Sequence, residues 1–251
     1  MKRSIQRLIL ALAAILLLLA SGVAWYAFST PPVEGLPLAD DLIAARSEQG
    51  HQLLKASPSK VDHGQLAEFL RPQIRRGFCG PATMAAVINA VLQPPVKVTQ
   101  TSLFTPAASA IKSELSVSLS GLTLDELAQM LRAHGLVARV VHSDQSDIAS
   151  FRTAVQATLS EPHTYMVVNY DRRVLGQAGA GHISPLGAFE PHADRVLVLD
   201  VAAYRYPYTW VPVTRLWSAM STVDTDSGRA RGYVLVKEDT RATSTTTESA
   251  R

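Results

Sequence analysis

The chain has little cysteine and little net charge. One cysteine, Cys79, occurs in 251 residues, which excludes an internal disulfide and disfavours a thiolate zinc site. The formal net charge of +3 is spread along the chain and does not favour a nucleic-acid partner. No phosphate-binding loop, internal repeat or His-x-x-x-His pair occurs. The histidines at positions 51, 63, 134, 142, 163 and 192 do not have the spacing of metal ligands: these are His51, His63, His134, His142, His163 and His192. We therefore predict that the protein has no metal site and no nucleic-acid partner.

The N-terminal segment has what the rest of the chain lacks, a long uncharged apolar run. Residues 8–28 contain no charge and follow three basic residues, Lys2, Arg3 and Arg7. As a helix this run spans about 32 Å, enough for a hydrocarbon core of about 30 Å. We expect residues 1–30 to be a signal anchor or a cleavable signal peptide, with membrane contact through residues 8–28.

Two details of this segment support different alternatives. Gly22-Val23-Ala24 has the small-x-small pattern of a signal cleavage site. The apolar run continues past that site, and Trp25, Tyr26 and Phe28 suit an interfacial belt, which favours a retained anchor. In both cases the basic flank stays in the cytoplasm and the rest of the chain is exported. An exported lone thiol points to reactivity, since it supplies no disulfide.

The remaining pattern places helices early and strands late, which favours an α+β fold. We expect one domain over residues 31–238 and a disordered tail over residues 239–251, where no apolar pattern is found. Residues 96–121 are not assigned. The expected helices include 81–92, which is apolar on nearly all sides, 123–134, which opens on a capping box, and 147–159; the expected strands are 137–142, 165–170, 182–189, 195–201 and 232–237.

Cys79 lies in a Gly-rich turn just before the apolar helix. A thiol attacks a carbonyl only as the thiolate, and a helix N-terminus lowers its pKa. Gly77 and Gly80 would let the backbone turn tightly. The alternative is a buried cysteine that only fills space. Gln73, six residues upstream, could point its amide into the same cleft and form an oxyanion hole with the backbone N–H of Cys79.

His182 and Asp200 complete a candidate constellation. The two strands on either side of residues 190–194 should form a hairpin, and if it is centred on Pro191, the two residues lie directly opposite each other. Asp200 could then hold the imidazole of His182, which would act as base and later as acid. The alternative is a core histidine and an aspartate at a strand end.

At these residues the chain resembles the phytochelatin synthase family, over about residues 35–238. The matching blocks lie at 73–80, 167–170, 181–190, 198–212 and 216–220. The resemblance implies a papain-like fold, with Cys79 as nucleophile, His182 as acid and base, Asp200 as its partner and Gln73 as oxyanion donor. It further implies substrate contacts from Asp224, Arg231, Arg172 and Gly181.

The implied activity is cleavage of glutathione at its Cys–Gly bond. The γ-glutamylcysteinyl acyl-enzyme then passes its acyl group to water or to a second glutathione, which yields phytochelatin. No cofactor is required, and heavy-metal ions act as metal–glutathione thiolates in this family's metal response. A γ-glutamyl group carries an ammonium, which the carboxylate of Asp224 can bind, and a carboxylate, which the guanidinium of Arg231 can bind.

The sequence departs from plant members in having no cysteine-rich half, so it resembles the short bacterial form. Together with the exported orientation of the N-terminal segment, this resemblance predicts a bacterial inner-membrane protein with an exported catalytic domain, or a periplasmic protein if the segment is cleaved. Two other functions stay open: a leader-peptide cysteine peptidase, which shares the Gln-x5-Cys spacing, and a non-catalytic module that binds glutathione or metal thiolates. Oligomeric state and the ratio of hydrolysis to transfer are not predicted.

Overall fold

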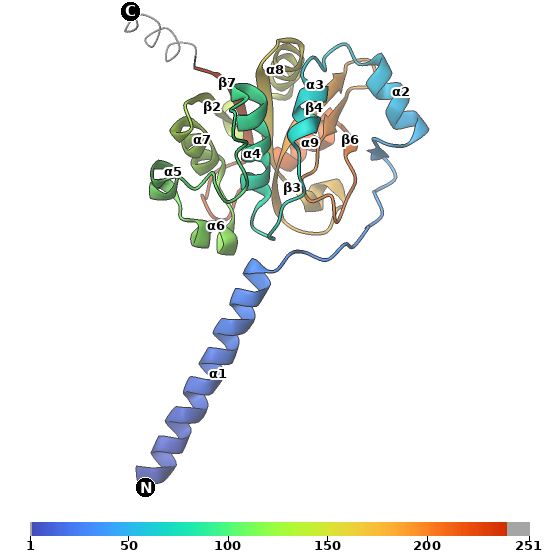
Figure 1. Cartoon of the computed structure of the whole chain (residues 1–251). Coiled ribbons are helices and arrows are strands. Elements are labelled where there is room, and N and C mark those ends of the chain that lie inside the picture. Colours follow the sequence, from blue (N-terminus) through green and yellow to red (C-terminus); the bar gives the residue numbers. More distant parts are fainter. Residues whose placement is uncertain (1, 240–251) are drawn as a thin grey trace, which may run out of the picture.

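A computed structural model describes residues 2–239. The expected disordered tail, apart from its first residue, lies outside the described residues. Helices dominate the first half and antiparallel strands the second, so the α+β prediction is confirmed (Figure 1). The helices are α1 (Lys2–Phe28), α2 (Glu48–Ala56), α3 (His63–Phe69), α4 (Cys79–Leu92), α5 (Pro106–Ile111), α6 (Glu114–Ser120), α7 (Leu124–Ala133), α8 (Ile148–Ser160) and α9 (Val213–Met220), with 3-10 turns η1 (Ser143–Gln145) and η2 (Arg172–Leu175).

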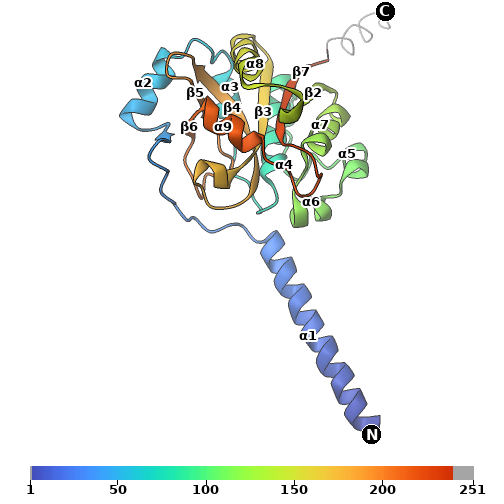
Figure 2. The same ribbon diagram turned by 180° about the vertical axis from the view of Figure 1, so that it is seen from behind.

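The strands form one antiparallel sheet in the order β1-β6-β5-β4-β3-β7-β2. Neighbouring residues of β3 face opposite sides, so Val167 packs with α4 and α7, whereas Met166 and Val168 pack with α8 and α9. Both faces are therefore covered by helices (Figures 1 and 2). The strands are β1 (Ile43–Ala44), β2 (Leu136–His142), β3 (Thr164–Asp171), β4 (Gly181–Glu190), β5 (Arg195–Val198), β6 (Thr209–Pro212) and β7 (Gly232–Glu238).

Helix α4 is the central buried helix that its composition predicts. Every residue from Cys79 to Val91 is buried. A hydrogen bond joins it to the sheet, because Thr83 Oγ1 donates to the carbonyl oxygen of Ile183 on β4 at 3.3 Å. The helix ends where Gln93 adopts the left-handed conformation, with φ of 44°. The start of α4 is thus held against the strand that carries His182.

Helix α1 extends away from the rest of the molecule (Figures 1 and 2). Its segment from Ile5 to Phe28 is long and apolar enough to cross a membrane. The side chains described along it are exposed, and Ala27, at its C-terminal end, is the buried exception. The predicted N-terminal apolar helix is therefore present.

The expected hairpin of β4 and β5 forms, but the predicted register is wrong. Glu190 pairs with Arg195, and a bulge shifts the register between Leu186 and Ala188. Leu199 then donates to Pro185, so β5 has ended before Asp200. The turn has four residues, 191–194, which is three more than a hairpin centred on Pro191 allows, and the bulge absorbs one. Asp200 therefore reaches the histidine from a loop rather than from an opposed strand position.

Candidate active site

Cys79 is the first residue of α4, and its surroundings are tightly packed. A Cβ atom on Gly80 would come within 2.7 Å of Leu122, and one on Gly77 would overlap the backbone carbonyl of Val117. Neither glycine has a positive φ. We expected these glycines to allow a tight turn. In the structure they instead allow close packing, Gly77 against α6 and Gly80 against Leu122, which follows α6. The loop before Cys79 can approach α6 only because Gly77 has no side chain.

His182 is the second residue of β4 and lies beside Asp200. Its Nε2 atom is 2.9 Å from Asp200 Oδ1, which leaves Nδ1 for the thiol. Asp200 also accepts from Arg172 Nη2 through both oxygens, each at 2.7 Å, and from the backbone N–H of Ala202 at 2.8 Å. The side chains of Cys79, His182 and Asp200, which we call the triad, are all buried. The carboxylate is held in one orientation by partners on three sides, and it orients the imidazole in turn.

The charges of this cluster shift the pKa values of its members. Burial raises the pKa of Cys79, but the hydrogen bond and charge of His182, together with backbone N–H groups of Ile183 and Gly80, bring it below its ordinary value. Burial and Arg172 lower the pKa of His182, yet Asp200 and Cys79 outweigh them and raise it. The site therefore favours a thiolate beside an imidazolium, which is the reactive form of a cysteine nucleophile.

Burial also acts on Asp200, and its partners prevail. Burial raises the pKa of this carboxyl, whereas His182 and Arg172 hold it well below its usual range. The carboxylate stays charged and can stabilise the imidazolium of His182. Tyr170 on β3 packs edge-on to the imidazole, with ring centroids 5.6 Å apart. The structure adds this residue to the site, and its place within the matching block at 167–170 was the only sequence signal for it.

Arg172 is placed differently from the expectation. It was expected to contact substrate, but its side chain is 3% exposed and its guanidinium binds Asp200 and Gln177. It also lies 5.3 Å from the ring centroid of Tyr206. The chain enters η2 directly after β3, and this turn directs the side chain beneath the site instead of into a cavity. The structure places Arg172 outside both cavities at Cys79, and its contacts are those of a residue that positions Asp200.

Gln73 lies on the loop before Cys79 and is buried. Its Nε2 donates to the backbone carbonyl oxygens of Arg75 and Arg76, both at 2.9 Å, with Tyr204 Oη at 3.4 Å. Its Oε1 is buried without a hydrogen-bond partner. Both amide hydrogens thus hold the loop in this conformation, and the predicted orientation of the amide into the cleft is not seen. An oxyanion role would require the amide to turn.

A cavity of about 230 Å³ opens beside Cys79, and its lining includes Asp224 and Arg231. Arg231 Nη1 donates to Asn169 Oδ1 at 2.8 Å and lies 3.2 Å from Asp224 Oδ2. Arg231 Nε is buried without a hydrogen-bond partner. A Cβ atom on Gly181 would come within 2.6 Å of Arg231 Nη1. The structure thus brings three of the expected substrate-contact residues together at one cavity, and Asn169 joins them.

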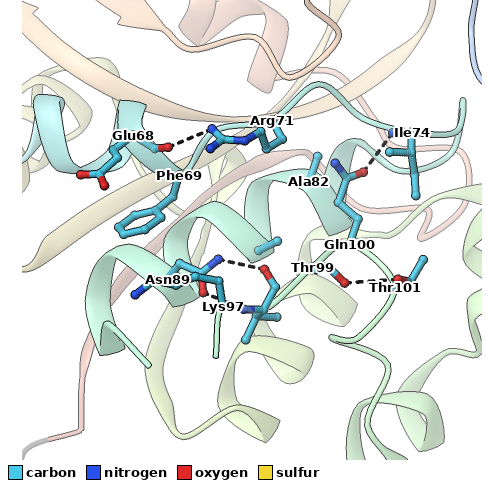
Figure 3. Close-up of a pocket in the computed structure, with 12 residues that line it drawn as sticks. Glu68, Phe69, Arg71, Ile74, Ala82, Asn89, Lys97, Thr99, Gln100 and Thr101 are labelled. Atoms are coloured by element: carbon cyan, nitrogen blue, oxygen red, sulfur yellow. Dashed lines mark hydrogen bonds between the residues drawn. The ribbon is translucent and has the colours of Figure 1, made fainter. Parts of the chain in front are cut away.

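A larger cavity, of about 540 Å³, lies elsewhere and contains none of the triad residues (Figure 3). Its polar side chains brace the chain around Gln73. Gln100 accepts from the backbone N–H of Ile74 at 3.0 Å and donates to the carbonyl oxygen of Pro72 at 2.8 Å. Figure 3 shows the hydrogen bond between Gln100 and the backbone of Ile74. This cavity supports the loop that leads to Cys79 but offers no nucleophile.

No cluster of three or more histidine, cysteine or carboxylate side chains suited to a metal ion occurs within residues 2–239. The comparisons with known proteins are consistent with the site. A family model described as phytochelatin synthase matches residues 33–233. The glutathione gamma-glutamylcysteinyltransferase 3 of Lotus japonicus is 33% identical over 187 residues, which cover 72% of this chain and 38% of that protein. The glutathione gamma-glutamylcysteinyltransferase of Schizosaccharomyces pombe is 30% identical over 177 residues, covering 68% of this chain and 42% of that protein.

The chain thus spans about two fifths of the length of these relatives. Among solved structures, Xylellain, a cysteine protease from Xylella fastidiosa, is 11% identical with a TM-score of 0.44, covering 84% of this chain and 97% of that chain. A likeness at this level carries no argument about activity.

Proposed function

The chain belongs to the phytochelatin synthase family, and from this premise we propose that it cleaves glutathione at the Cys–Gly bond and transfers the γ-glutamylcysteinyl group to water or to a second glutathione. The observation that carries the proposal is the meeting of two sets of residues at Cys79. A thiol paired with His182 and Asp200 supplies the nucleophile, and a cavity with Arg231 and Asp224 supplies recognition.

The donor peptide is recognised by its γ-glutamyl group. This group carries an ammonium and a carboxylate on one carbon, and the cavity presents the carboxylate of Asp224 next to the guanidinium of Arg231. Charge-assisted hydrogen bonds of this kind are stronger than neutral ones, and both side chains are buried. The Nε of Arg231 is buried without a hydrogen-bond partner, so the guanidinium has an unused donor in addition to its bonds to Asn169 and Asp224.

The chemistry then follows from the pair of Cys79 and His182. The thiolate attacks the carbonyl carbon of the peptide's cysteine residue, and a C–S bond forms. His182 gives its proton to the amide nitrogen as the C–N bond breaks, and glycine leaves with a neutral amine. In the second half, His182 takes a proton from water or from the acceptor's amine, which attacks the thioester and frees Cys79. The backbone N–H groups of Ile183 and Gly80, which face the sulfur, are candidate donors to the thiolate.

No step of this route needs a metal ion bound by the protein. We propose that heavy-metal ions enter as thiolate complexes of glutathione, and that α1 anchors the domain to a membrane. The basic residues before the apolar run support a bacterial inner-membrane protein with an exported domain. If the segment is cleaved, the alternative is release to the periplasm.

The direct test is mass spectrometry of the full chain in detergent after brief mixing with glutathione. We expect a γ-glutamylcysteinyl adduct on Cys79, released glycine, and neither product from Cys79→Ala. Because Cys79 is the single cysteine, the adduct has one possible thiol site. Binding of glutathione without adduct or glycine would favour a binding module, and cleavage of a leader peptide without action on glutathione would favour a leader-peptide peptidase. Either result would overturn the proposal.

A further inference from the structure

A second cavity meets the donor cavity at Cys79. It has a volume of about 330 Å³ and lies between the end of α1 and α6. The two cavities share Cys79, Ser120, Gly121 and Gly181. An acyl group held in the donor cavity has its carbonyl carbon at the sulfur, so the rest of the peptide must continue beyond this junction. The second cavity opens from the same junction and offers space for that part.

Arg76 is the one permanently charged side chain among the described residues that line this second cavity. Its guanidinium lies 4.2 Å from the ring centroid of Tyr26. Its Nη1 donates to the backbone oxygen of Tyr26 at 3.1 Å and to Ser29 Oγ at 3.2 Å. A guanidinium has five N–H donors, so these bonds leave Nη2 and Nε to serve a further acceptor. The stacking holds a half-buried positive charge at the cavity wall.

The neighbouring arginine is committed elsewhere. Arg75 Nη1 lies 2.6 Å from Glu114 Oε1, and its guanidinium stacks between the rings of Phe28 and Phe78, at 4.7 and 4.6 Å from their centroids. The charge of Arg75 is therefore balanced by a carboxylate, while its stacking seats the end of α1 on the domain. Arg76 has no ion-pair partner within 4 Å among the described residues, although its charge also acts on Glu34, which pairs with Arg205, and Arg76 is the cation that lines the cavity.

We propose that this cavity takes the C-terminal glycine of the donor peptide, with Arg76 binding the glycine carboxylate and the last turns of α1 forming the wall. The assignment rests on the proposed function and adds where the leaving group lies. Glutathione ends in a carboxylate one residue beyond the bond that breaks, and this cavity begins at Cys79 and carries a positive charge. The apolar segment thereby contributes Tyr26 and Ala27 to the active-site cleft.

The test compares two peptides and two variants of the full chain in detergent. Glutathione and its glycine monoethyl ester differ only in the carboxylate that Arg76 would bind. We expect wild type to favour glutathione by about tenfold in kcat/KM, as for one charge-assisted hydrogen bond, and Arg76→Met to lose this preference. Arg71→Met is the matched control, because this exposed arginine lines a different cavity, and it should keep the preference.

The outcomes separate this inference from the proposed function. Equal turnover of the two peptides by wild type, or a preference kept in Arg76→Met, would overturn the carboxylate assignment while leaving glutathione cleavage intact. Absence of glycine release from glutathione, together with absence of glycine ethyl ester release from its ester, would overturn the proposed function instead.

A second measurement needs no turnover. Iodoacetate carries a carboxylate and iodoacetamide does not, and both alkylate Cys79. We expect the ratio of the iodoacetate rate to the iodoacetamide rate to fall severalfold in Arg76→Met. It should also fall in Tyr26→Ala, because this change removes the ring on which the guanidinium stacks. It should stay unchanged in Trp25→Ala, because Trp25 is 72% exposed. A ratio unaffected by Arg76→Met would refute the assignment even if glutathione is not the substrate.

Discussion

Replacing Arg172 by methionine separates a positioning role from a substrate-binding role. Arg172 and Asp200 are 3% and 2% exposed, and Nη2 lies 2.7 Å from both carboxylate oxygens. Breaking a buried pair by removing one partner costs about 3–5 kcal/mol. Asp200 keeps its bonds to His182 and to the backbone N–H of Ala202, so we expect the lower end, about 3 kcal/mol, in the free energy of unfolding.

The kinetic signature is equally specific. Since Arg172 touches the orienting carboxylate and lines neither cavity at Cys79, we expect Arg172→Met to lower kcat and to leave the KM for glutathione nearly unchanged. Arg231→Met, its matched arginine replacement inside the donor cavity, should instead raise KM. Glycine release at varied glutathione concentration, with urea unfolding of each variant, measures both quantities.

Acid provides a further check on the charge effect. Arg172 helps to keep the pKa of Asp200 below its usual range, so the stability from this pairing is present above the carboxyl's unfolded pKa and is lost as the pH falls through the folded pKa. The variant takes up a proton at higher pH than wild type. The gap between their free energies of unfolding should therefore narrow mainly as the pH falls below the ordinary aspartate pKa of about 3.9, toward the depressed folded pKa of wild type. A raised KM with unchanged kcat and unchanged stability would refute the positioning role.

Three further perturbations test other parts of the molecule. The pH profile of Cys79 alkylation should have its midpoint below that of an ordinary thiol, about 8.5, and His182→Ala should move the midpoint upward, because burial then acts without its opposing partner; an unmoved midpoint would contradict the pairing. Gly181→Ala places a Cβ atom 2.6 Å from Arg231 Nη1 and should raise the KM for glutathione about tenfold, or about 1.4 kcal/mol, whereas an unchanged KM would remove Arg231 from donor recognition. Thr123→Ala removes the capping box of α7 and should cost about 1 kcal/mol in urea unfolding without changing activity per folded molecule; equal stability would show that the cap is dispensable.

Local signals predicted the long elements well. The apolar run from Pro81 gave α4, which begins two residues earlier at Cys79, and the capping box at Thr123 gave α7. The Ser-rich stretch 96–121 hides two short helices, α5 and α6, which begin after caps at Thr105 and Ser113. Helices of six or seven residues are too short for a periodic pattern, so their caps were the available signal.

The site shows where sequence reasoning ends. Residue types and order predicted that Cys79, His182 and Asp200 belong together, but not how they meet. A bulge near Gly187 sets the hairpin register, and a bulge is decided by packing on both faces of the sheet. The partner of Arg172 likewise depends on the direction in which η2 leaves β3. Strand β6 and the helix α9 after it depend on contacts with the rest of the sheet, since a four-residue strand ending in Pro212 has no pattern of its own.

The nucleophile and its base come from opposite ends of the catalytic region, and the contact that fixes α4 to β4 joins residues 100 positions apart, Thr83 and Ile183. A ribosome makes the chain from its N-terminus, so Cys79 emerges long before His182 exists. Until the two halves meet, His182 and Ile183 do not lower the pKa of the thiol, and the cysteine of an unfolded chain has nearly ordinary reactivity. The reactivity that the pairing with His182 gives to Cys79 therefore arises only when folding is complete, and an unfinished chain carries a thiol without that activation.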